Sequence, residues 1–595
     1  MSKIKTIKLH DTNCTILQNR VRRLPHQKLL SYKTKSGSWI DITAQSFQKY
    51  IISISKGLVN LGIKKNDKIA IMSKTSFEWV ALDFAAWTIG AVTVPIYETS
   101  SSHQIQFICN DAEIKMLFVE NIDMYKLVNL VKPKLKTVKT IRNLDENALD
   151  ELQTIGQSIK TSQIKKLQTQ NKSTDLATIV YTSGSTGKHK GVEIQHKAFI
   201  SVVYSSNEAL PELLQMPNSA ILLFLPLAHV FARFAVLAIM EGVSALALSG
   251  NLKTLLNDMR YIQPNYIIGV PRIFEKVYNA ASQKAGHGIK QRIFQKAAKI
   301  AMQYSESLDT PNGPSPKLIS QRLLYDKLIY KQIKNVLGGK MRWCVSGGAS
   351  LNPQIAHFFR GAGIEILEGY GLTEITAPAL CNRPNNNRIG TVGLPFINVE
   401  TKIAKDGELL IKTPSAFLGY HNEPKLTKQV FKNKWLYTGD LAEIDDYGFI
   451  KLVGRKKDII VTSGGKNISP GALEQIIINN PLVSHCVVIG DKKPFISALV
   501  TLDTGALEVW SKKHRLKNLN LKQASRNKAI YAEIQRSVDE ANETVSRAES
   551  IRKFIILPEE FTVENGFLTA SMKIIKRHII NAYKEVIDND IYKKY

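Results

Sequence analysis

Short runs of β-branched and aliphatic residues alternate with longer amphipathic stretches along the first three quarters of the chain. One run at Lys68–Met72 precedes the helical stretch Ser76–Ile89, and a second run follows at Val92–Ile96. Similar runs recur later in the sequence, at Ala220–Leu225, Asn265–Val270 and Met341–Val345. A repeated order of strand, helix and strand is typical of parallel sheets covered by helices. The pattern therefore predicts an α/β fold.

The pattern restarts after Gly454 with a smaller set of elements. It predicts strands at Asp458–Val461, His485–Ile489 and Phe495–Leu502, and helices at Pro470–Asn479 and Ser525–Val545. The last of these is a helix with one apolar face, formed by Ile530, Ile534, Val538, Ala541 and Val545. We therefore expect a large, multi-layer α/β domain at residues 1–454 and a small α+β domain at residues 455–595.

Three stretches lack the alternation. Gln157–Thr174 is polar and lysine-rich, which predicts a connection, and Tyr304–Ser320 contains three prolines, which predicts an exposed loop. Ile289–Met302 has the pattern of a basic amphipathic helix. We prefer the interpretation that this helix packs on its own domain, and membrane binding is the alternative.

Composition narrows the class of protein. The 595 residues are 44% hydrophobic, enough for a core in each of several layers. The five cysteines are scattered and form no CxxC pair, so we expect neither a disulfide framework nor a zinc site, and a reducing cytoplasm fits best. The N-terminus shows no signal-peptide pattern, and the longest charge-free stretch, Leu213–Ala232, holds prolines and polar residues and is not expected to span a membrane.

The formal net charge of +29 predicts attraction to something anionic. Nucleic acid, anionic lipid and a polyphosphate substrate all qualify, and a compositional bias toward Ile, Lys and Asn would give the same excess. The sequence contains no nucleic-acid-binding motif, so we expect no nucleic acid as a partner. The oligomeric state stays open.

A run rich in glycine and hydroxyl groups follows an apolar stretch. Residues Tyr181–Gly191 read YTSGSTGKHKG. The Walker A pattern requires a glycine at Thr182 and a Ser or Thr at His189, so the P-loop NTPases are excluded. Backbone N–H and side-chain hydroxyl groups in such a run can still converge on phosphate oxygens, and Lys190 adds positive charge. The run predicts a phosphate-binding loop, with a simple glycine turn as the alternative.

This run closely resembles the phosphate loop of the adenylate-forming (AMP-binding) enzymes, and further blocks of that family follow in order. They are PLAHVFAR from Pro226, VPRIFEKVY from Val270, SGGASL from Ser346, EGYGLTE from Glu368, YTGDLAEIDDYGFIKLVGRKKDIIVTSGGKNISP from Tyr437 and NGFLTASMKIIKR from Asn565. VPIYETSS and the blocks from Pro226 and Val270 are most similar to long-chain fatty-acid–CoA ligases. The resemblance implies ATP with Mg²⁺, a long-chain fatty acid and CoA as ligands, and a mobile C-terminal lid domain.

The resemblance also assigns roles to residues that bind ATP. The leaving phosphates would be held by Thr182, Ser183, Gly184, Ser185, Thr186, Gly187 and Lys190. Thr373 would bind the α-phosphate, and Glu374 would hold Mg²⁺. The adenosine would contact Gly347, Gly348, Glu368, Gly369, Tyr370, Gly371, Asp440 and Arg455. Among these, Tyr370 would stack on adenine and Asp440 would accept hydrogen bonds from the ribose.

Five other residues would serve the chemistry and the domain motion. Lys573 would reach the acyl carboxylate and the α-phosphate during adenylation. Lys457 would be the hinge of the lid, and Gly464 with Gly465 would line the tunnel for CoA. His229 matches a position beside the acyl pocket, with a satisfied core histidine as the equal alternative.

Departures from the family pattern are few. His189 stands where a proline is common, and Ala570 with Ser571 stand where Pro-Thr is common; none of these removes a charge that the mechanism needs. We therefore expect a long-chain-fatty-acid–CoA ligase in the cytoplasm, with peripheral contact to the inner face of a membrane as a weaker prediction. The alternatives are a fatty acyl-AMP ligase that loads a carrier protein and a catalytically silent, basic membrane-binding protein.

Overall fold

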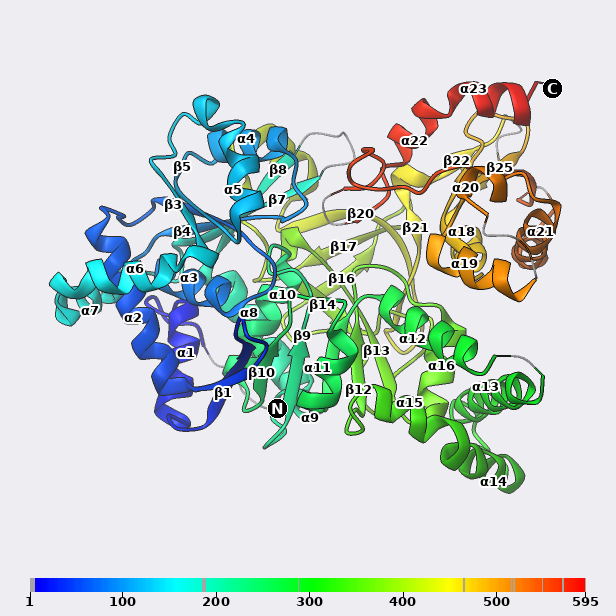
Figure 1. Cartoon of the computed structure of the whole chain (residues 1–595), viewed down its shortest axis with the longest axis horizontal. Coiled ribbons are helices and arrows are strands. Elements are labelled where there is room, and N and C mark those ends of the chain that lie inside the picture. Colours follow the sequence, from blue (N-terminus) through cyan, green and yellow to red (C-terminus); the bar gives the residue numbers. More distant parts are fainter. Residues whose placement is uncertain are drawn as a thin grey trace. The chain divides into compact units, whose positions relative to one another are not determined.

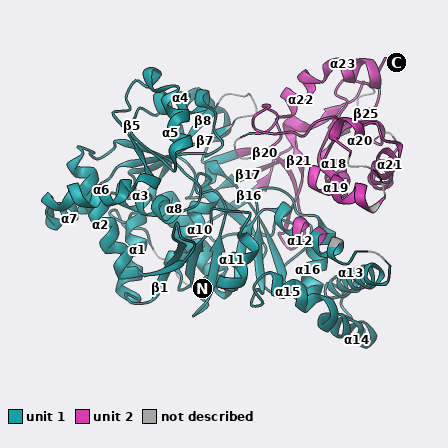
Figure 2. Ribbon diagram, in the orientation of Figure 1, with its two compact units in different colours: residues 1–274, 280–401, 411–436 teal, residues 275–279, 402–410, 437–595 magenta. Residues whose placement is uncertain are grey.

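The computed structural model of the chain describes residues 6–593 except 184–188, 287, 464–465, 515, 517–518, 548 and 570–571. The chain forms two compact units (Figure 2). Unit 1 holds residues 1–274, 280–401 and 411–436, and unit 2 holds residues 275–279, 402–410 and 437–595. The chain passes from one unit to the other inside helix α12 (Pro271–Lys284) and inside three strands, β16 (Glu400–Ile403), β17 (Glu408–Lys412) and β20 (Trp435–Ile444).

The first sheet of unit 1 has nine strands in the order β15-β14-β13-β12-β11-β9-β10-β1-β2. Its central strands, from β13 to β1, run parallel, and β14, β15 and β2 pair antiparallel at its two edges. The strand bounds are β1 Lys28–Lys33, β2 Trp39–Thr43, β9 Ala220–Leu223, β10 Ala245–Leu248, β11 Tyr266–Gly269, β12 Trp343–Ser346, β13 Glu365–Leu372, β14 Ala377–Cys381 and β15 Leu394–Pro395.

The second sheet of unit 1 has seven strands in the order β18-β8-β7-β4-β3-β5-β6. Strands β7, β4, β3, β5 and β6 are parallel, and β8 returns antiparallel beside β7. The bounds are β3 Lys68–Met72, β4 Val92–Ile96, β5 Ile114–Val119, β6 Thr140–Asn143, β7 Leu176–Ser183, β8 His189–Gln195 and β18 Gly419–Tyr420. All five residues of β4 are buried, as expected for a parallel strand covered on both faces.

Helices lie among and around these two sheets (Figure 1). They include α3 Phe77–Thr88, α5 Ile122–Asn129, α7 Thr161–Thr169, α8 His196–Ala209, α9 Pro211–Leu214, α10 Val230–Glu241, α13 Ile289–Ser307, α14 Pro316–Tyr325, α15 Lys331–Val336 and α16 Pro353–Ala362. The others in unit 1 are α1 Asn13–Arg23, α2 Ala44–Asn60, α4 Ser102–Asp111, α6 Ala148–Ile155, α11 Leu255–Ile262 and α17 Pro424–Val430, and α12 spans Pro271–Lys284.

A buried ion pair ties α10 to the second sheet. Arg233 donates from Nε and Nη2 to the carboxylate of Asp83 on α3, at 2.8 and 2.6 Å, and from Nη1 to Thr178 on β7. Its guanidinium lies 5.3 Å from the ring centroids of Trp79 and Trp87. Because each charge is paired and hydrogen-bonded, the block that begins at Pro226 is fixed in the core of unit 1.

Unit 2 contains a two-stranded sheet and a three-stranded sheet with helices. Strand β24 (Val483–Ile489) pairs antiparallel with β25 (Ile496–Leu502), which pairs parallel with β26 (Ile551–Ile556). The remaining elements are β21 Ile450–Arg455, β22 Ile460–Val461, β23 Asn467–Ile468, α18 Gly471–Ile478, α19 Thr504–Lys513, α20 Leu521–Ala524, α21 Lys528–Glu543, α22 Lys576–Ala582 and α23 Lys584–Val586. Ile530, Ile534, Val538 and Ala541 of α21 are buried, as their spacing predicts.

Two stretches are more helical than the sequence predicts. The polar connection at residues 157–174 contains α7, whose Ile164 is buried. The expected loop at 304–320 is only partly a loop, because α13 continues to Ser307 and α14 begins at Pro316. Pro316 occupies the first turn of α14, where a helix needs no backbone N–H donor, and Ser315 caps that turn by accepting from Leu318.

Candidate active site

The predicted phosphate loop begins in β7 and continues into β8, and these two strands pair antiparallel. Thr182 pairs with Lys190 across the hairpin, and Ser183 pairs with His189. Gly184, Ser185, Thr186 and Gly187 lie outside the described residues. The hairpin places Lys190 directly beside the loop that it is predicted to assist.

Lys190 and Glu374 come together around a third residue, Tyr420. The Tyr420 hydroxyl donates a hydrogen bond of 2.7 Å to Oε1 of Glu374. Lys190 Nζ lies 5.3 Å from the centroid of the Tyr420 ring. Burial and the neighbouring Glu374 carboxylate raise the pKa of Tyr420, so the phenol stays a donor at neutral pH. A cation and a carboxylate that both lie beside one tyrosine suit a site for phosphate and a divalent metal ion.

The residue after Tyr420, His421, holds the end of β18 against β8 through a pair with Glu193. His421 Nδ1 lies 2.6 Å from Oε1 of Glu193 on β8, and this hydrogen bond, more than any other effect, raises the pKa of His421. The backbone N–H of His421 donates to the carbonyl of Gly191. These contacts fix Tyr420 against the hairpin that carries Lys190.

Thr373 and Glu374 lie in a short 3₁₀ turn at the end of β13. The chain doubles back there so closely that a Cβ on Gly371 would stand 1.9 Å from the carbonyl oxygen of Ala377. Only glycine fits at position 371. Thr373 is nearly buried, directly after the strand that carries Tyr370.

A pocket lies next to this turn and is partly open to solvent. The predicted residues His229, Gly347, Gly348, Gly369, Tyr370 and Gly371 all line it. The other lining side chains are mostly aliphatic or aromatic. They come from β11, β12, β13, β14, α8, α9 and α10 and from the turns between α8 and α9 and after β15. A mostly apolar lining with a few polar groups is ordinary for a small-molecule site.

The pocket runs along the strands of the first sheet. Tyr266 and Ile268 line it from β11, and Val345 and Gly347 line it from the neighbouring β12 and its end. Residues two apart point to one face of a strand, so one face of this sheet forms the pocket wall. Tyr266, Leu213 and Leu214 also line the pocket and are buried.

His229 caps α10 as well as lining the pocket. Its Nδ1 accepts a hydrogen bond of 3.2 Å from the backbone N–H of Phe231. In the neutral ring the proton is then on Nε2. The structure therefore gives His229 a role in helix capping, and its role in catalysis stays a prediction.

Glu368 is buried beside the same pocket. Its Oε1 accepts from the backbone N–H of Leu351 at 3.1 Å, and burial raises its pKa to about 8. The side chain thus fastens the SGGASL loop to the end of β13. Its predicted contact with ATP stays a prediction.

Asp440 and Arg455 face each other across an antiparallel pair of strands in unit 2. They are register partners of β20 and β21, and Arg455 Nε lies 2.9 Å from Oδ1 of Asp440. Asp440 is buried, whereas the Arg455 side chain is exposed. The two predicted ribose ligands therefore form one paired group.

Lys457 and Lys573 are exposed residues of unit 2. Lys457 lies in a single 3₁₀ turn, Lys456–Asp458. Lys573 lies at the end of a tight loop in which Thr569 N–H donates to the Lys573 carbonyl and Lys573 N–H donates to the Thr569 hydroxyl. Gly464 and Gly465 lie outside the described residues.

Comparison with known proteins decides the family. A family profile described as AMP-binding enzyme matches residues 17–421, and one described as AMP-binding enzyme C-terminal domain matches residues 457–595. The chain belongs to the AMP-binding enzyme family. The family predicted from the motifs and the α/β architecture with a smaller C-terminal part are thereby confirmed.

Individual relatives agree with this assignment. Long-chain-fatty-acid--CoA ligase FadD15 of Mycobacterium bovis is 39% identical over 562 residues, which cover 94% of this AMP-binding enzyme and 93% of that relative. The solved structure of the anthranilate CoA ligase AuaEII in complex with anthranoyl-AMP has a TM-score of 0.71 at 18% identity and covers 98% of this chain and 99% of that chain. O-succinylbenzoate Coenzyme A synthetase (MenE) from Bacillus subtilis, in complex with ATP and magnesium ion, has a TM-score of 0.68 at 20% identity, with 95% and 99% covered.

One residue of this site was missed by the sequence analysis. Tyr420 lies 46 residues from Glu374, in a run without charge or spacing that would single it out. Tyr420 reaches the site because β18 pairs with the edge of β8, a contact between segments far apart in the chain.

Proposed function

We propose that this AMP-binding enzyme activates a long-chain fatty acid with ATP and transfers the acyl group to CoA, giving acyl-CoA, AMP and pyrophosphate. The observation that carries the proposal is the largely apolar pocket, which is also lined by Gly347, Gly348 and Gly369. Each methylene group buried there would contribute about 0.8 kcal/mol. Similarity to a long-chain-fatty-acid ligase over nearly the whole chain points to the same substrate class.

In the first half-reaction the fatty carboxylate attacks the α-phosphorus of ATP. A P–O bond forms, and pyrophosphate leaves with the electrons of the broken P–O bond. Two anions meet at this centre, so the site must align them and supply positive charge. In our proposal residues 182–187 and Lys190 hold the leaving phosphates, Thr373 contacts the α-phosphate, and Lys573 binds the carboxylate and α-phosphate.

The residues around Glu374 fit Mg²⁺. Within the described residues, no group of three or more His, Cys, Asp and Glu side chains could hold a metal ion. Mg²⁺ usually binds one or two carboxylates together with substrate phosphates and water, and one oriented carboxylate beside a phosphate loop meets that need. We propose Glu374 as the protein ligand of a Mg²⁺ ion that neutralises phosphate charge.

In the second half-reaction the CoA thiol attacks the acyl carbonyl, a C–S bond forms and AMP leaves. We propose that residues 455–595 act as a lid domain that turns about Lys457, withdraws Lys573 and brings Gly464 and Gly465 to the CoA tunnel. Asp440 and Arg455 would hold the ribose, and Tyr370 the adenine. Peripheral contact with a membrane is part of the proposal, since a long-chain fatty acid partitions into lipid.

The test is AMP release from ATP with palmitate, with and without CoA, and with acetate as the control acid. We expect sustained AMP and acyl-CoA only when palmitate and CoA are both present. Lys573→Ala should lower adenylation at least a hundredfold, because a charge at the reacting centre is lost. Lys528→Ala, at another exposed lysine of unit 2, is the matched control and should leave the rate unchanged.

Two results would contradict the proposal. A stoichiometric burst of acyl adenylate that CoA does not relieve would identify a different acceptor, such as a carrier protein. Absence of AMP release with any fatty acid would favour a silent binding protein.

A further inference from the structure

Four large aliphatic side chains are exposed on α14 and the π-helical turn that follows it (Asp326–Tyr330). Their exposed fractions are 39% for Ile319, 55% for Leu323, 56% for Leu324 and 47% for Leu328. The opposite side of the same segment is anchored in the protein, because Tyr325 and Tyr330 are buried and the Tyr330 hydroxyl donates to the carbonyl of Ala297. Clusters of exposed apolar groups of this kind are typical of interaction surfaces.

The neighbouring helix α13 buries most of the apolar face that its sequence predicts. Phe294, Ala297 and Ile300 are buried, and the Phe294 ring lies 6.3 Å from that of Phe358 on α16, so the helix packs on its own domain. Ile289 and Ile293, near the start of α13, stay exposed at 76% and 37%. The larger exposed cluster belongs to α14, which lies next to α13 at one edge of unit 1 (Figure 1).

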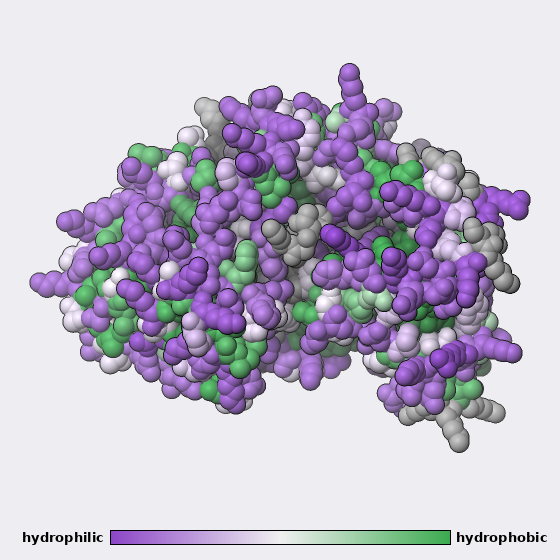
Figure 3. All heavy atoms as spheres, turned by 90° about the horizontal axis from the view of Figure 1, so that it is seen from above, coloured by the Kyte–Doolittle hydropathy of each residue, from purple (hydrophilic) through white to green (hydrophobic). Residues whose placement is uncertain are grey.

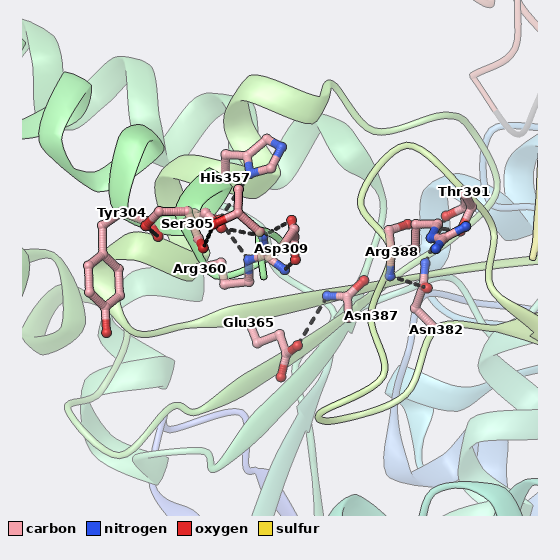
Figure 4. Close-up of polar contacts among 12 residues, drawn as sticks. Tyr304, Ser305, Asp309, His357, Arg360, Glu365, Asn382, Asn387, Arg388 and Thr391 are labelled. Atoms are coloured by element: carbon pink, nitrogen blue, oxygen red, sulfur yellow. Dashed lines mark hydrogen bonds and ion pairs between the residues drawn. The ribbon is translucent and has the colours of Figure 1, made fainter. Parts of the chain in front are cut away.

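Polar contacts hold α13 firmly in place (Figure 4). Arg360 on α16 donates to the hydroxyl and carbonyl of Ser305, at 2.6 Å each, and to Asp309 at 3.0 Å. The Ser305 hydroxyl also lies 3.0 Å from Nδ1 of His357. The helix pair therefore has a fixed inner side and an outer side free for docking.

The segment is strongly basic. Between Ile289 and Lys334 the sequence has nine Lys and Arg residues and three Asp and Glu residues. Two of the acidic residues are bound internally, Asp309 by Arg360 and Asp326 by Lys334 at 3.3 Å. Lys317, Lys327 and Lys331 are exposed on the same segment as the aliphatic side chains. Hydrophilic residues also dominate the face of the molecule drawn in Figure 3.

We propose that α14 and the following turn form a docking face for an anionic lipid surface. Aliphatic side chains would enter the boundary between headgroups and acyl chains, and the surrounding lysines would meet the phosphates. A second copy of this chain is a poorer occupant, because two faces of the same positive charge repel each other. This inference rests on the proposed function, in which the fatty-acid substrate reaches the enzyme from lipid.

No helix within the described residues is both long and apolar enough to cross a membrane. In the proposed docking, the edge of unit 1 that carries α14 would contact the lipid surface.

The experiment is co-sedimentation of the full chain with vesicles of phosphatidylcholine alone or mixed with phosphatidylglycerol, without ATP. We expect binding to the anionic vesicles only, weakened by salt. Leu323→Glu with Leu324→Glu should reduce binding at least tenfold, because both side chains leave the lipid and two charges oppose it. Ile122→Glu with Leu130→Glu, two exposed aliphatic residues at α5, is the control of equal charge and should bind nearly as the parent does.

A second variant, Lys317→Glu with Lys327→Glu, tests the electrostatic part and should lower binding to anionic vesicles while the melting temperature stays the same. Equal binding by the parent and both α14 variants, or no binding by the parent, would overturn the proposal. A parent dimer that becomes a monomer in the Leu323, Leu324 variant would also overturn it and assign the face to a second copy. AMP release with octanoate, measured on the same samples, reports the ligase function separately.

Discussion

At the scale of single residues, the orientation of Glu374 depends on Tyr420. A hydrogen bond to a charged group contributes about 1.5–3 kcal/mol, so Tyr420→Phe should raise the Mg²⁺ concentration for half-maximal adenylation about tenfold or more. The ring should still pack, since its centroid lies 5.0 Å from that of Phe417, and the melting temperature should change little. Titration of initial adenylation rates with Mg²⁺ measures the effect.

A second variant separates the hydrogen bond of Tyr420 from the packing of its ring. Tyr420→Ala removes the packing as well and should lower the melting temperature. An unchanged Mg²⁺ requirement in Tyr420→Phe would show that the Tyr420 hydroxyl does not orient the metal ligand.

Motifs predict chemistry at single positions and miss the contacts that hold them. The sequence predicted Lys190 and Glu374 separately, and only the fold places Tyr420 between them. Glu368 belongs to a recognised block, yet its bond to Leu351 depends on how two strand ends meet. Contacts of this kind join residues far apart in the chain, and a pattern within one segment cannot contain them.

At the scale of elements, α10 and α9 set the depth of the pocket. Phe234 and Ala238 line it one turn apart on α10, and Leu214 lines it on α9. Ala238→Phe should fill space that a long chain needs, so kcat/KM for palmitate should fall at least tenfold relative to octanoate, about 1.4 kcal/mol. Rates with acids of increasing length measure the shift.

Ala235→Phe is the matched control on the same helix, at a buried position away from the pocket lining. It should overpack the core and lower stability by about 1–3 kcal/mol without changing chain-length preference. A palmitate-to-octanoate ratio unaffected by Ala238→Phe would place the acyl chain elsewhere.

The elements themselves could be predicted where periodicity was strong. The runs at residues 68–72 and 92–96 are strands with the predicted bounds, and α21 buries the predicted face. The prolines at 311, 314 and 316 predicted a loop over residues 304–320, and this prediction was partly wrong. A proline in the first turn starts a helix as readily as it ends one, and Pro316 begins α14. The exposed leucines of α14 were invisible in the sequence, since only packing shows which face a helix leaves uncovered.

At the scale of the whole molecule, our proposal requires one lid domain to serve two half-reactions in turn. The hinge at Lys457 must then change its backbone angles between them. Proline fixes φ near −65°, so Lys457→Pro should keep adenylation within about threefold and lower acyl-CoA formation at least tenfold. Pyrophosphate exchange measures the first step, and acyl-CoA formation from preformed acyl adenylate measures the second.

Lys457→Ala separates the hinge from the charge of the side chain. It removes the ammonium group but leaves φ free, so both half-reactions should stay near the parent rates. Equal loss of both steps in Lys457→Pro would indicate damage to unit 2, which a lowered melting temperature would reveal. Loss of thioester formation in both variants would instead assign Lys457 a direct contact with CoA. Only selective loss in the proline variant fits a lid that must turn, because then backbone freedom, and not a side-chain contact, limits the second step.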